Sequence, residues 1–538
     1  MAVEFPLNAI DTRCPSPSPR AVLRARALAT GSLVVASYLF RLPPLLNARS
    51  TNSDAAIVGL QALHILRGEW SPLLWGSGYQ TSADAFVAAA FFAIGGATPL
   101  SLMVSALTLH VFATFFVFAT LTRRFDSWTS LLLTSPLIFS PSSVHTYALY
   151  PPRQLSITLA LAAFWAMDGA AQREPRIRTR AAFRGYGWLA LGGALYGLAV
   201  SADPYPIVVA PIVVGYGVLV AVERRPDEAR RWAGALQRLC LLGGTTLAGL
   251  LPFVVIHRMA SAKSGPMTLS ADLLPHNWEL LVRECLPWAL SYKVYYAHNV
   301  MDYRPWDPPA VVQAVQIVGA VALGGIVAVG LVAIFAKTIP WATRRLGFMG
   351  ALTYPVAMGA FLVSVMVMDH FSMRYLAVLT LMLPFASVTA LYLLGKRYFA
   401  ALIAPHLVAS ALGGWVGYGP FVRGALPVRE TPELRDDYAL YELLQARNIR
   451  YAEADYWASY RLTFLFGERI VVVPTNPNED RYAPYRRAFD RAPVFAYVFD
   501  PGRSREELAE AESALLRDNA SVETLRAGGH TVFLVTRK

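Results

Sequence analysis

Two aspartates stand where chemistry at a membrane surface would need an acid. Asp54 lies in TNSDAAIVGLQALHILRGEW (51–70), directly after a long apolar run, and Asp84 lies in WGSGYQTSADAF (75–86), directly before another. A carboxylate at such a position can take the proton of an attacking hydroxyl group, which is general base catalysis. An acid at membrane depth is costly unless it is paired or lines a cavity. Both acids also have a plain alternative, because aspartate is common at helix N-termini.

Four cationic or titratable side chains are predicted to lie on the same side of the membrane as these acids: Arg153, Lys293, His370 and Arg374. Fixed positive charges stabilise a phosphate leaving group as its negative charge develops. Arg153 and Arg374 are the preferred candidates, because the guanidinium fork matches two phosphate oxygens. Taken singly, each cation could equally reach toward lipid headgroups, so only their convergence would indicate a site.

Three further polar side chains of the first loop are candidates for substrate binding. On a helix that begins near Asp54, Gln61 lies almost beneath that residue and His64 follows on the same side. Tyr79 comes later, in the loop that contains two glycines. The other positions of the helix are apolar, so we expect it to lie in the membrane interface with its polar edge toward water or a cavity.

The composition indicates what kind of molecule must position these residues. Of 538 residues, 55% are hydrophobic and 16% are charged, and the mean hydropathy is +0.40, which excludes an ordinary soluble globule. Apolar runs of about 17 to 25 residues, each fit for a hydrocarbon core roughly 30 Å thick, recur along the chain. We predict an all-α polytopic membrane bundle of eleven transmembrane helices. Their ranges are 28–46, 98–121, 127–144, 154–171, 186–202, 206–222, 236–256, 310–336, 346–367, 375–394 and 400–418.

The distribution of Lys and Arg predicts the orientation. These residues concentrate in the N-terminal tail and in every second short loop after it, and the positive-inside rule assigns that side to the cytoplasm. The net charge of +12 and the pI of about 9.6 arise mostly from these loops, so they do not support a nucleic-acid partner. With an odd number of spans, the C-terminal segment is expected on the outer side.

The last part of the chain has a different texture. Helical spacing in ELRDDYALYELLQAR and SREELAEAESALLRD alternates with strand-like runs such as RIVVVP and VFAYVF, which predicts an α/β domain. We divide the chain into a cytoplasmic tail (1–27), a transmembrane domain (28–419) and an extracytoplasmic α/β domain (420–538). The α/β domain is expected to be a structural or acceptor-guiding cap without chemistry of its own.

The order of these segments resembles the GT-C superfamily of integral-membrane glycosyltransferases, in particular the bacterial branch similar to dolichyl-phosphate-mannose protein mannosyltransferases. The resemblance rests on Asp54, the segments LQALHILRGE and WGSGYQTSADAF, the later MRYLAVLTLMLP, and YAEADYWASYRLTFLFGERIVVVP in the tail. The chain departs from the family pattern at Asp84, where glutamate is usual and the shorter aspartate reaches less far.

This resemblance implies in-plane helices over an outward-facing site, a polyprenyl-phosphate-linked sugar donor and inversion at the anomeric carbon. Asp54 would be the general base, and Asp84 would orient the sugar or assist Asp54. The four cations would contact the donor phosphate. The acceptor would be a protein, a lipid or a polysaccharide, and the location a bacterial inner membrane. No cofactor is required, although two acids and a phosphate could hold a divalent metal ion.

Two other classes of protein stay open at this level. A transporter or lipid flippase would use acids and broken helices within the membrane, and Asp203 in SADPYP could serve it. Against this class, we see no convincing internal repeat, and the ionisable residues gather at the outer ends of the spans. A non-catalytic envelope assembly protein with an exterior domain would tolerate replacement of Asp54, which the enzyme would not.

Overall fold

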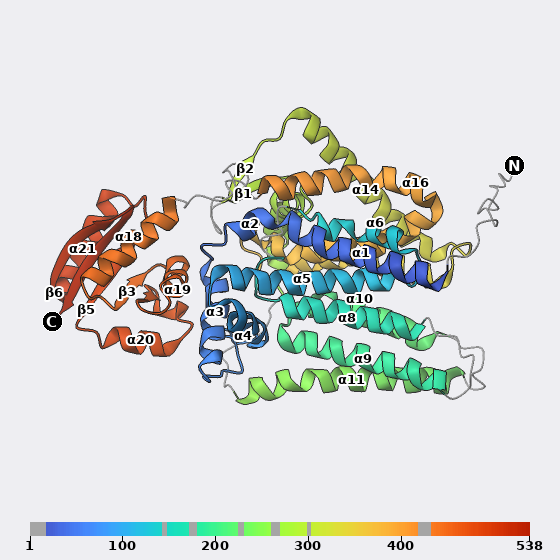
Figure 1. Cartoon of the computed structure of the whole chain (residues 1–538), viewed down its shortest axis with the longest axis horizontal. Helices are drawn as coiled ribbons and strands as arrows, with labels where there is room; N and C mark the ends of the chain where they lie inside the picture. Colours follow the sequence, from blue (N-terminus) through green and yellow to red (C-terminus); the bar gives the residue numbers. More distant parts are fainter. Residues whose placement is uncertain are drawn as a thin grey trace.

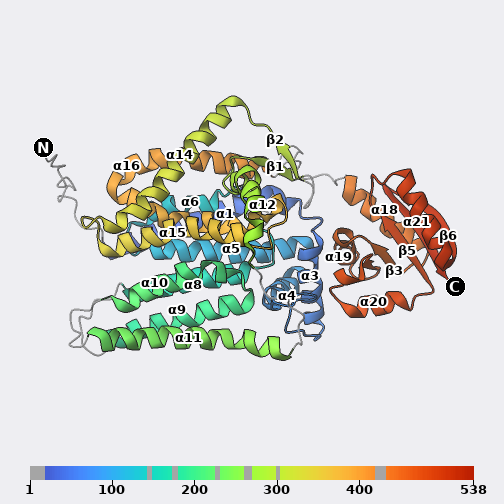
Figure 2. The same cartoon turned by 180° about the vertical axis from the view of Figure 1, so that it is seen from behind.

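The chain folds into a bundle of long helices and a smaller α/β domain, as its computed structural model shows (Figure 1). The structure describes residues 18–141, 148–171, 180–223, 231–259, 269–297, 303–417 and 432–538. The main helices of the bundle are α1 (Pro19–Phe40), α5 (Pro99–Leu121), α6 (Ser127–Ile138), α8 (Gln154–Ala171), α9 (Arg180–Ala202), α10 (Ala210–Val222), α11 (Arg231–Met259), α14 (Ala310–Val332), α15 (Trp341–Val363) and α16 (Ala377–Gly417). Figure 2 shows from behind that the α/β domain lies at one end of this bundle.

Eight stretches of the described residues are helical, long and apolar enough to cross a membrane, so the chain is a multi-pass membrane protein of the predicted all-α class. One of the eight is His370–Val416, in which α16 is broken at Gly395 (φ 75°), between the spans predicted at 375–394 and 400–418. The helices α6, with 12 residues, and α9 are not among the eight. The predicted number of eleven spans is therefore not confirmed.

The first long helix begins and ends earlier than the span predicted at 28–46. It starts at Pro19, whose missing N–H suits the first turn of a helix. It ends at Phe40, before the short helix α2 (Leu42–Leu46), because the two prolines of LPPLL cannot extend the hydrogen-bond ladder of α1. Residues 19–27 of the predicted tail thus belong to α1.

Three parts of the predicted organisation lie outside the described residues. They are the tail up to residue 17, the end of the span predicted at 127–144, and the domain boundary predicted at 420. The α/β domain is described from residue 432 onward.

Two short helices lie at the end of the bundle that carries the α/β domain. They are α3 (Ser53–Leu66) and α4 (Ala83–Gly95), and α3 runs across the direction of the long helices (Figure 1). With 14 and 13 residues, neither is long enough to cross a membrane, which agrees with the predicted in-plane helices of the first loop. Further short elements of the bundle are η1 (Tyr205–Val209), α12 (Leu274–Leu280), α13 (Leu286–Ala289), β1 (Val294–Ala297), β2 (Tyr303–Trp306) and η5 (His370–Leu376).

The C-terminal domain has the predicted α/β class. Its elements are α18 (Pro432–Ala446), β3 (Tyr451–Ala454), α19 (Tyr456–Leu465), β4 (Val471–Pro474), α20 (Ala483–Asp490), β5 (Val494–Phe499), α21 (Arg505–Asp518), β6 (Asn519–Ala527) and β7 (His530–Arg537). The sheet has the order β4-β3-β5-β7-β6, in which β3 is parallel to β4 and β5, and β7 is antiparallel to β5 and β6. The strand β4 (VVVP) is buried throughout, as expected for a parallel strand covered on both faces.

The α/β domain is docked on α3 through α19. The Ser53 hydroxyl donates to the carbonyl of Trp457 (2.9 Å) and accepts from the N–H of Arg461 (3.2 Å). A Cβ on Gly59 would lie 2.8 Å from the ring of Phe464, so the two helices approach closely only because residue 59 is glycine. The prediction that the polar edge of α3 faces water or a cavity is therefore corrected. Most side chains of α3 are small or apolar, so the helix buries both faces, between α4 and α19.

Replacing Gly59 with leucine should loosen the docking of the α/β domain. Overpacking of a buried contact costs ~1–3 kcal/mol, so we expect Gly59→Leu to lower the Tm of the purified protein and to speed proteolytic release of the domain. The matched control is Gly31→Leu in α1, where an added Cβ meets nothing within 4 Å. Equal Tm and equal proteolysis of the two variants would contradict the docking contact.

Candidate functional site

Asp54 lies where α3 meets the α/β domain. The N-cap of α3 is Asn52, whose side chain accepts from the N–H of Ala55 (2.8 Å), so the carboxylate of Asp54 is not the cap. Its Oδ2 accepts from the hydroxyl of Tyr150 (3.1 Å), and its Oδ1 accepts from the hydroxyl of Tyr456. The half-buried carboxylate thus faces two hydroxyl donors, which is the contact that a base makes with the hydroxyl of a substrate.

Tyr456 comes from the α/β domain and is held by Arg481. The Arg481 Nε donates to the Tyr456 hydroxyl (3.2 Å), and Nη1 donates to the carbonyl of Gly76 (3.0 Å). Gly76 has a φ of 64°, and a Cβ there would lie 2.3 Å from the Arg481 Cδ, so the loop needs glycine at this position. Burial and the charge of Asp54 raise the pKa of Tyr456 well above its ordinary value, which keeps its hydroxyl a donor. The α/β domain therefore contributes two side chains to the surroundings of the acid.

Asp84 is buried and is turned toward the start of α8. Its Oδ2 accepts from the N–H of Arg153 (2.9 Å) and its Oδ1 from the N–H of Leu155 (3.0 Å). It thereby satisfies two N–H groups that have no partner within the helix. Burial raises the pKa of Asp84 to about 7, although these two hydrogen bonds oppose the shift. This position favours a capping role for Asp84 over the predicted catalytic role. The helix that Asp84 caps is α8, whereas Asp84 itself belongs to α4.

Arg153 is held from both ends. Its backbone has a φ of 78°, in the left-handed region that side chains with a Cβ rarely adopt, and its N–H is bound by Asp84. Its Nε lies 3.3 Å from the Oδ2 of Asp203. Its guanidinium carbon lies 5.8 Å from the centre of the Tyr205 ring and 5.5 Å from that of Tyr375. A strained backbone between two acids sets the direction of this side chain.

Arg374 joins the same group of side chains. Its Nη2 donates to the hydroxyl of Tyr375 (3.4 Å), and its guanidinium carbon lies 5.2 Å from the centre of that ring. Burial and the charge of Asp54 raise the pKa of Tyr150, whereas the charges of Arg374 and Arg153 lower it. The charges of the acid and of the two preferred arginines, which come from three distant parts of the sequence, therefore act on one phenol, and both guanidinium groups lie near the ring of Tyr375.

Tyr79 is the only one of the three predicted substrate-binding residues beside this group. Tyr79 is 37% exposed. Burial lowers the pKa values of Arg153 and Arg481, and the phenol of Tyr79 is among the groups that raise them. Gln61 is buried and donates to the carbonyl of Leu73 (3.0 Å), which ties the loop after α3 to the helix. These contacts leave Tyr79 as the candidate for substrate binding and give Gln61 a structural role.

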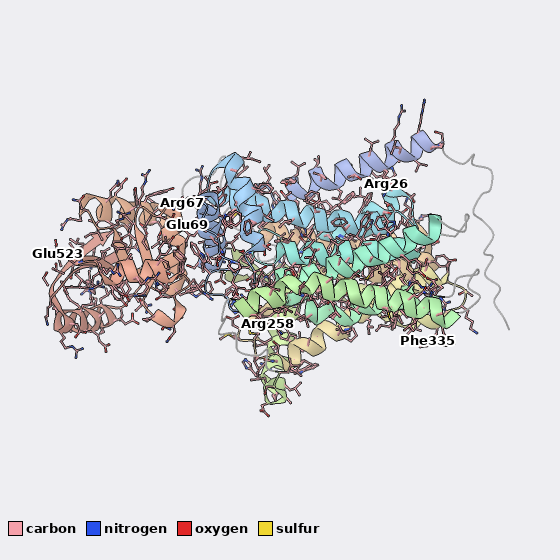
Figure 3. The ribbon with its side chains drawn as sticks, turned by 90° about the horizontal axis from the view of Figure 1, so that it is seen from below. Arg26, Arg67, Glu69, Arg258, Phe335 and Glu523 are labelled. Atoms are coloured by element: carbon pink, nitrogen blue, oxygen red, sulfur yellow. The ribbon has the colours of Figure 1, made fainter. Side chains whose placement is uncertain are left out.

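His64 joins α3 to the α/β domain. Its Nδ1 lies 2.6 Å from Oε2 of Glu69, and its Nε2 lies 2.6 Å from Oε1 of Glu468. Glu468 also accepts from the hydroxyl of Tyr485 and lies 2.6 Å from Nη1 of Arg67. Figure 3 shows Arg67 and Glu69 where the bundle meets the α/β domain. We call these five residues the latch; they give His64 a role in docking rather than in substrate binding.

Lys293 and His370 are engaged elsewhere. Lys293 pairs with Glu284. The ring of His370 lies 5.7 Å from that of Trp288 and 4.2 Å from that of Phe371. These contacts do not involve the acid or the two arginines, and a role of Lys293 and His370 in binding the donor phosphate stays a prediction.

Sequence reasoning missed most of the residues that connect the site. Four of the missed residues are tyrosines, and two of these lie beside or close to a predicted arginine in the sequence. This proximity could have identified them, because phenols bind charged partners at membrane interfaces. The sequence indicates Asp203 only as a residue that a transporter could use, and nothing in the sequence indicates a role for Arg481 of the α/β domain. The missed residues are Tyr150, Asp203, Tyr205, Tyr375, Tyr456 and Arg481.

The two predicted acids do not share a partner. Asp54 accepts from two hydroxyl groups and Asp84 from two backbone N–H groups. Within the part of the chain that the structure describes, no group of three His, Cys, Asp or Glu side chains could hold a metal ion.

Known proteins resemble this chain in fold but not in sequence. No protein-family model matches it, and no curated protein matches it in sequence. Among solved structures it is similar to ArnT from Cupriavidus metallidurans in the apo state, with 12% identity and a TM-score of 0.48 over 94% of this chain and 98% of that one. It is also similar to the same ArnT bound to undecaprenyl phosphate, with 13% identity and a TM-score of 0.46 over 94% of this chain and 97% of that one.

A third similar structure is the archaeal oligosaccharyltransferase AglB from Archaeoglobus fulgidus, in complex with an inhibitory peptide and a dolichol-phosphate. The identity is 11% and the TM-score 0.45, over 94% of this chain and 74% of that one. These likenesses are of fold alone. They assign neither a substrate nor a reaction to this chain.

The latch should make docking of the α/β domain depend on pH. Burial lowers the pKa of His64, but Glu468 and Glu69 raise it more, so the net shift is upward from 6.5. The pKa of Glu468 is lowered to about 2, because hydrogen bonds from His64 and Tyr485 outweigh its burial. The contribution of His64 to the stability of the folded protein is complete below pH 6.5 and is lost as the pH rises through its raised pKa. The contribution of Glu468 to this stability is complete above pH 4.5 and is lost as the pH falls toward 2.

We therefore expect the Tm difference between wild type and His64→Gln to be largest between pH 4.5 and 6.5 and to shrink at higher pH. Thermal unfolding of both proteins across this pH range measures it. A difference that stays constant from acid to alkaline pH would show that the latch does not titrate as described.

Proposed function

We propose that the chain is an inverting glycosyltransferase that moves a sugar from a polyprenyl-phosphate donor to an acceptor hydroxyl, with Asp54 as the general base. The observation that carries the proposal is that Tyr150 donates to Asp54, while the guanidinium carbons of Arg153 and Arg374 lie 5.5 Å and 5.2 Å from the centre of one ring, that of Tyr375. Sugar transfer from a phosphate needs a proton acceptor and a stabiliser of the anionic leaving group, and these side chains supply both. One similar structure holds undecaprenyl phosphate and another a dolichol-phosphate, and we propose a donor of this chemical class.

The reaction exchanges one bond at the anomeric carbon for another. The acceptor oxygen forms a bond to that carbon while the bond from the carbon to the phosphate oxygen breaks, and its electron pair leaves with the phosphate. The acceptor proton passes to Asp54, which needs to take it only as the hydroxyl becomes acidic in the transition state. Tyr150 and Tyr456 already occupy one position on each carboxylate oxygen, so the acceptor hydroxyl replaces one of them or uses a second lone pair.

The two arginines stabilise the negative charge of the donor phosphate. Arg153 and Arg374 each present a planar set of N–H donors, and the lipid chain of the donor extends from the phosphate into the bilayer. Asp84 and Asp203 act on Arg153 rather than on the substrate, because one binds its backbone and the other its guanidinium group. We therefore replace the catalytic role predicted for Asp84 with a positioning role.

The orientation of the chain is part of the proposal. The helix α1 begins at the end of the bundle opposite the α/β domain (Figure 1). This agrees with a cytoplasmic N-terminus and with an α/β domain on the periplasmic or extracellular face of a bacterial inner membrane. The acceptor on that face is a protein, a lipid or a polysaccharide.

Replacing the base should abolish transfer. Protein in nanodiscs is offered a panel of polyprenyl-phosphate sugars with a membrane extract as acceptor, and release of free polyprenyl phosphate is measured. General base catalysis contributes about 100- to 10,000-fold, so Asp54→Asn should lower the rate by at least that lower factor. The matched control is Glu279→Gln, which changes an exposed acid that pairs with Arg283 and should leave the rate unchanged.

Equal release by wild type and Asp54→Asn, both with unaltered Tm, would exclude this acid as the base. Release from no donor in the panel would favour the transporter or the assembly protein. The same assay with a metal chelator tests whether a divalent ion takes part.

The two arginines should matter for the donor more than the other predicted cations do. In Arg153→Lys and Arg374→Lys the charge stays but the fork is lost, so kcat/KM for the donor should fall about tenfold or more. Lys293→Gln should stay within about twofold of wild type, because Lys293 pairs with Glu284 outside the site. A larger loss from Lys293→Gln than from either arginine variant would move the phosphate contact to that residue.

A further inference from the structure

The C-terminal sheet contains a topological switch point. The strand β3 lies between β4 and β5 and is parallel to both. The chain passes from β3 through α19 to β4 on one side, and from β4 through α20 to β5 on the other side of β3. Leu462 of α19 and Phe489 of α20 belong to cores on opposite faces of the sheet. In open α/β sheets, ligands bind at the carboxyl ends of the two strands where the connection reverses, which are here β3 and β5.

An aspartate follows each of these two strands. Asp455 comes directly after β3 and Asp500 directly after β5, and these two strands are neighbours in the sheet. Burial and the neighbouring Asp455 raise the pKa of Asp500 to about 6, and its side chain is still 41% exposed. Asp455 also caps α19, so the acid pair by itself has a structural explanation.

His530 supplies an independent observation. It is the first residue of β7, the neighbour of β5, and only 3% of it is exposed. Its Nε2 lies 3.3 Å from Oδ1 of Asp437. Its Nδ1 has no hydrogen-bond partner among the described residues and lies 3.7 Å from Oδ1 of Asp500. A buried ring nitrogen without a hydrogen-bond partner therefore lies beside the carboxyl group of Asp500, and a ligand there would complete its hydrogen bonding.

These residues adjoin the proposed base. Asp455 directly precedes Tyr456, whose hydroxyl donates to Asp54. The next residue, Trp457, is 43% exposed, and its ring meets that of Tyr456 edge to face with centroids 5.1 Å apart. An exposed indole beside paired carboxyl groups suits a sugar ring, because the ring has an apolar face for stacking and hydroxyl groups that donate to acids.

We propose that Asp455, Asp500 and His530 form an acceptor subsite that binds a carbohydrate through two vicinal hydroxyl groups, with Trp457 as the stacking surface. Each hydroxyl donates to one carboxyl group, and the Nδ1 of His530 completes the set of partners. The role of the subsite rests on the proposed function, since an acceptor held there presents a further hydroxyl toward Asp54. The acceptor is then a glycan rather than a peptide.

The experiment measures binding without a donor, so that it does not depend on turnover. The full-length protein in nanodiscs is titrated with the methyl glycosides of mannose, galactose and glucose, and with their deoxy analogues that lack one vicinal hydroxyl. Saturation-transfer NMR reports which glycosides bind. The variants are Asp500→Asn, His530→Gln and Trp457→Ala, and the matched control is Glu479→Gln, an exposed acid in η6 (Pro477–Glu479) of the same domain.

We expect at least one glycoside to bind wild type and Glu479→Gln alike, and to bind Asp500→Asn and Trp457→Ala about tenfold more weakly. Its deoxy analogue should bind wild type as weakly as the variants do. No binding to wild type, or equal binding to wild type, Asp500→Asn and Trp457→Ala, would overturn the subsite. Glycoside binding that behaves as expected, in a protein that releases no polyprenyl phosphate, would refute the proposed transfer reaction and leave the carbohydrate site standing.

Discussion

The packing of α19 on α3 is the contact on which the rest of the site depends. Through it the α/β domain brings Tyr456 to Asp54 and Arg481 to the loop at Gly76, which joins residues about 400 positions apart in the chain. The contact needs small groups, because Gly59 leaves room for the ring of Phe464. The acid is therefore completed by a domain that lies outside the membrane bundle, and the surroundings of Asp54 depend on how firmly that domain is docked.

A second constraint acts on Arg153, one of the two arginines proposed to contact the donor phosphate. Arg153 adopts a backbone conformation that costs of order 1–3 kcal/mol for a residue with a Cβ. Asp84 binds its N–H and Asp203 its guanidinium group, so the strain is offset by contacts at both ends. A buried charge of this kind persists only when it is paired. The acid that the sequence offered as a second catalytic group therefore serves to aim an arginine.

Paired charges alone do not identify a site in this chain. Asp168 in α8 is fully buried and is bound by Arg123 and Arg124, with the hydroxyl of Tyr216 as a third partner. This group joins α8 to α10 and to the residues that follow α5. Asp54 differs because its carboxylate is half-buried and is bound by hydroxyl groups, which an incoming substrate hydroxyl can replace.

The sequence by itself determined the class of the protein, the in-plane helices and the α/β class of the last domain, whereas the roles it predicts for Asp54, Arg153 and Arg374 stay predictions. These follow from the lengths of apolar runs, from helical and strand spacing, and from charge type, which are local properties. Only the tertiary structure decided which partners these residues meet: that Asp84 caps α8, that His64 binds Glu468, and that the α/β domain reaches the acid. The physical reason is that such contacts join distant segments, and which segments meet is set by the packing of whole helices rather than by any short stretch of residues.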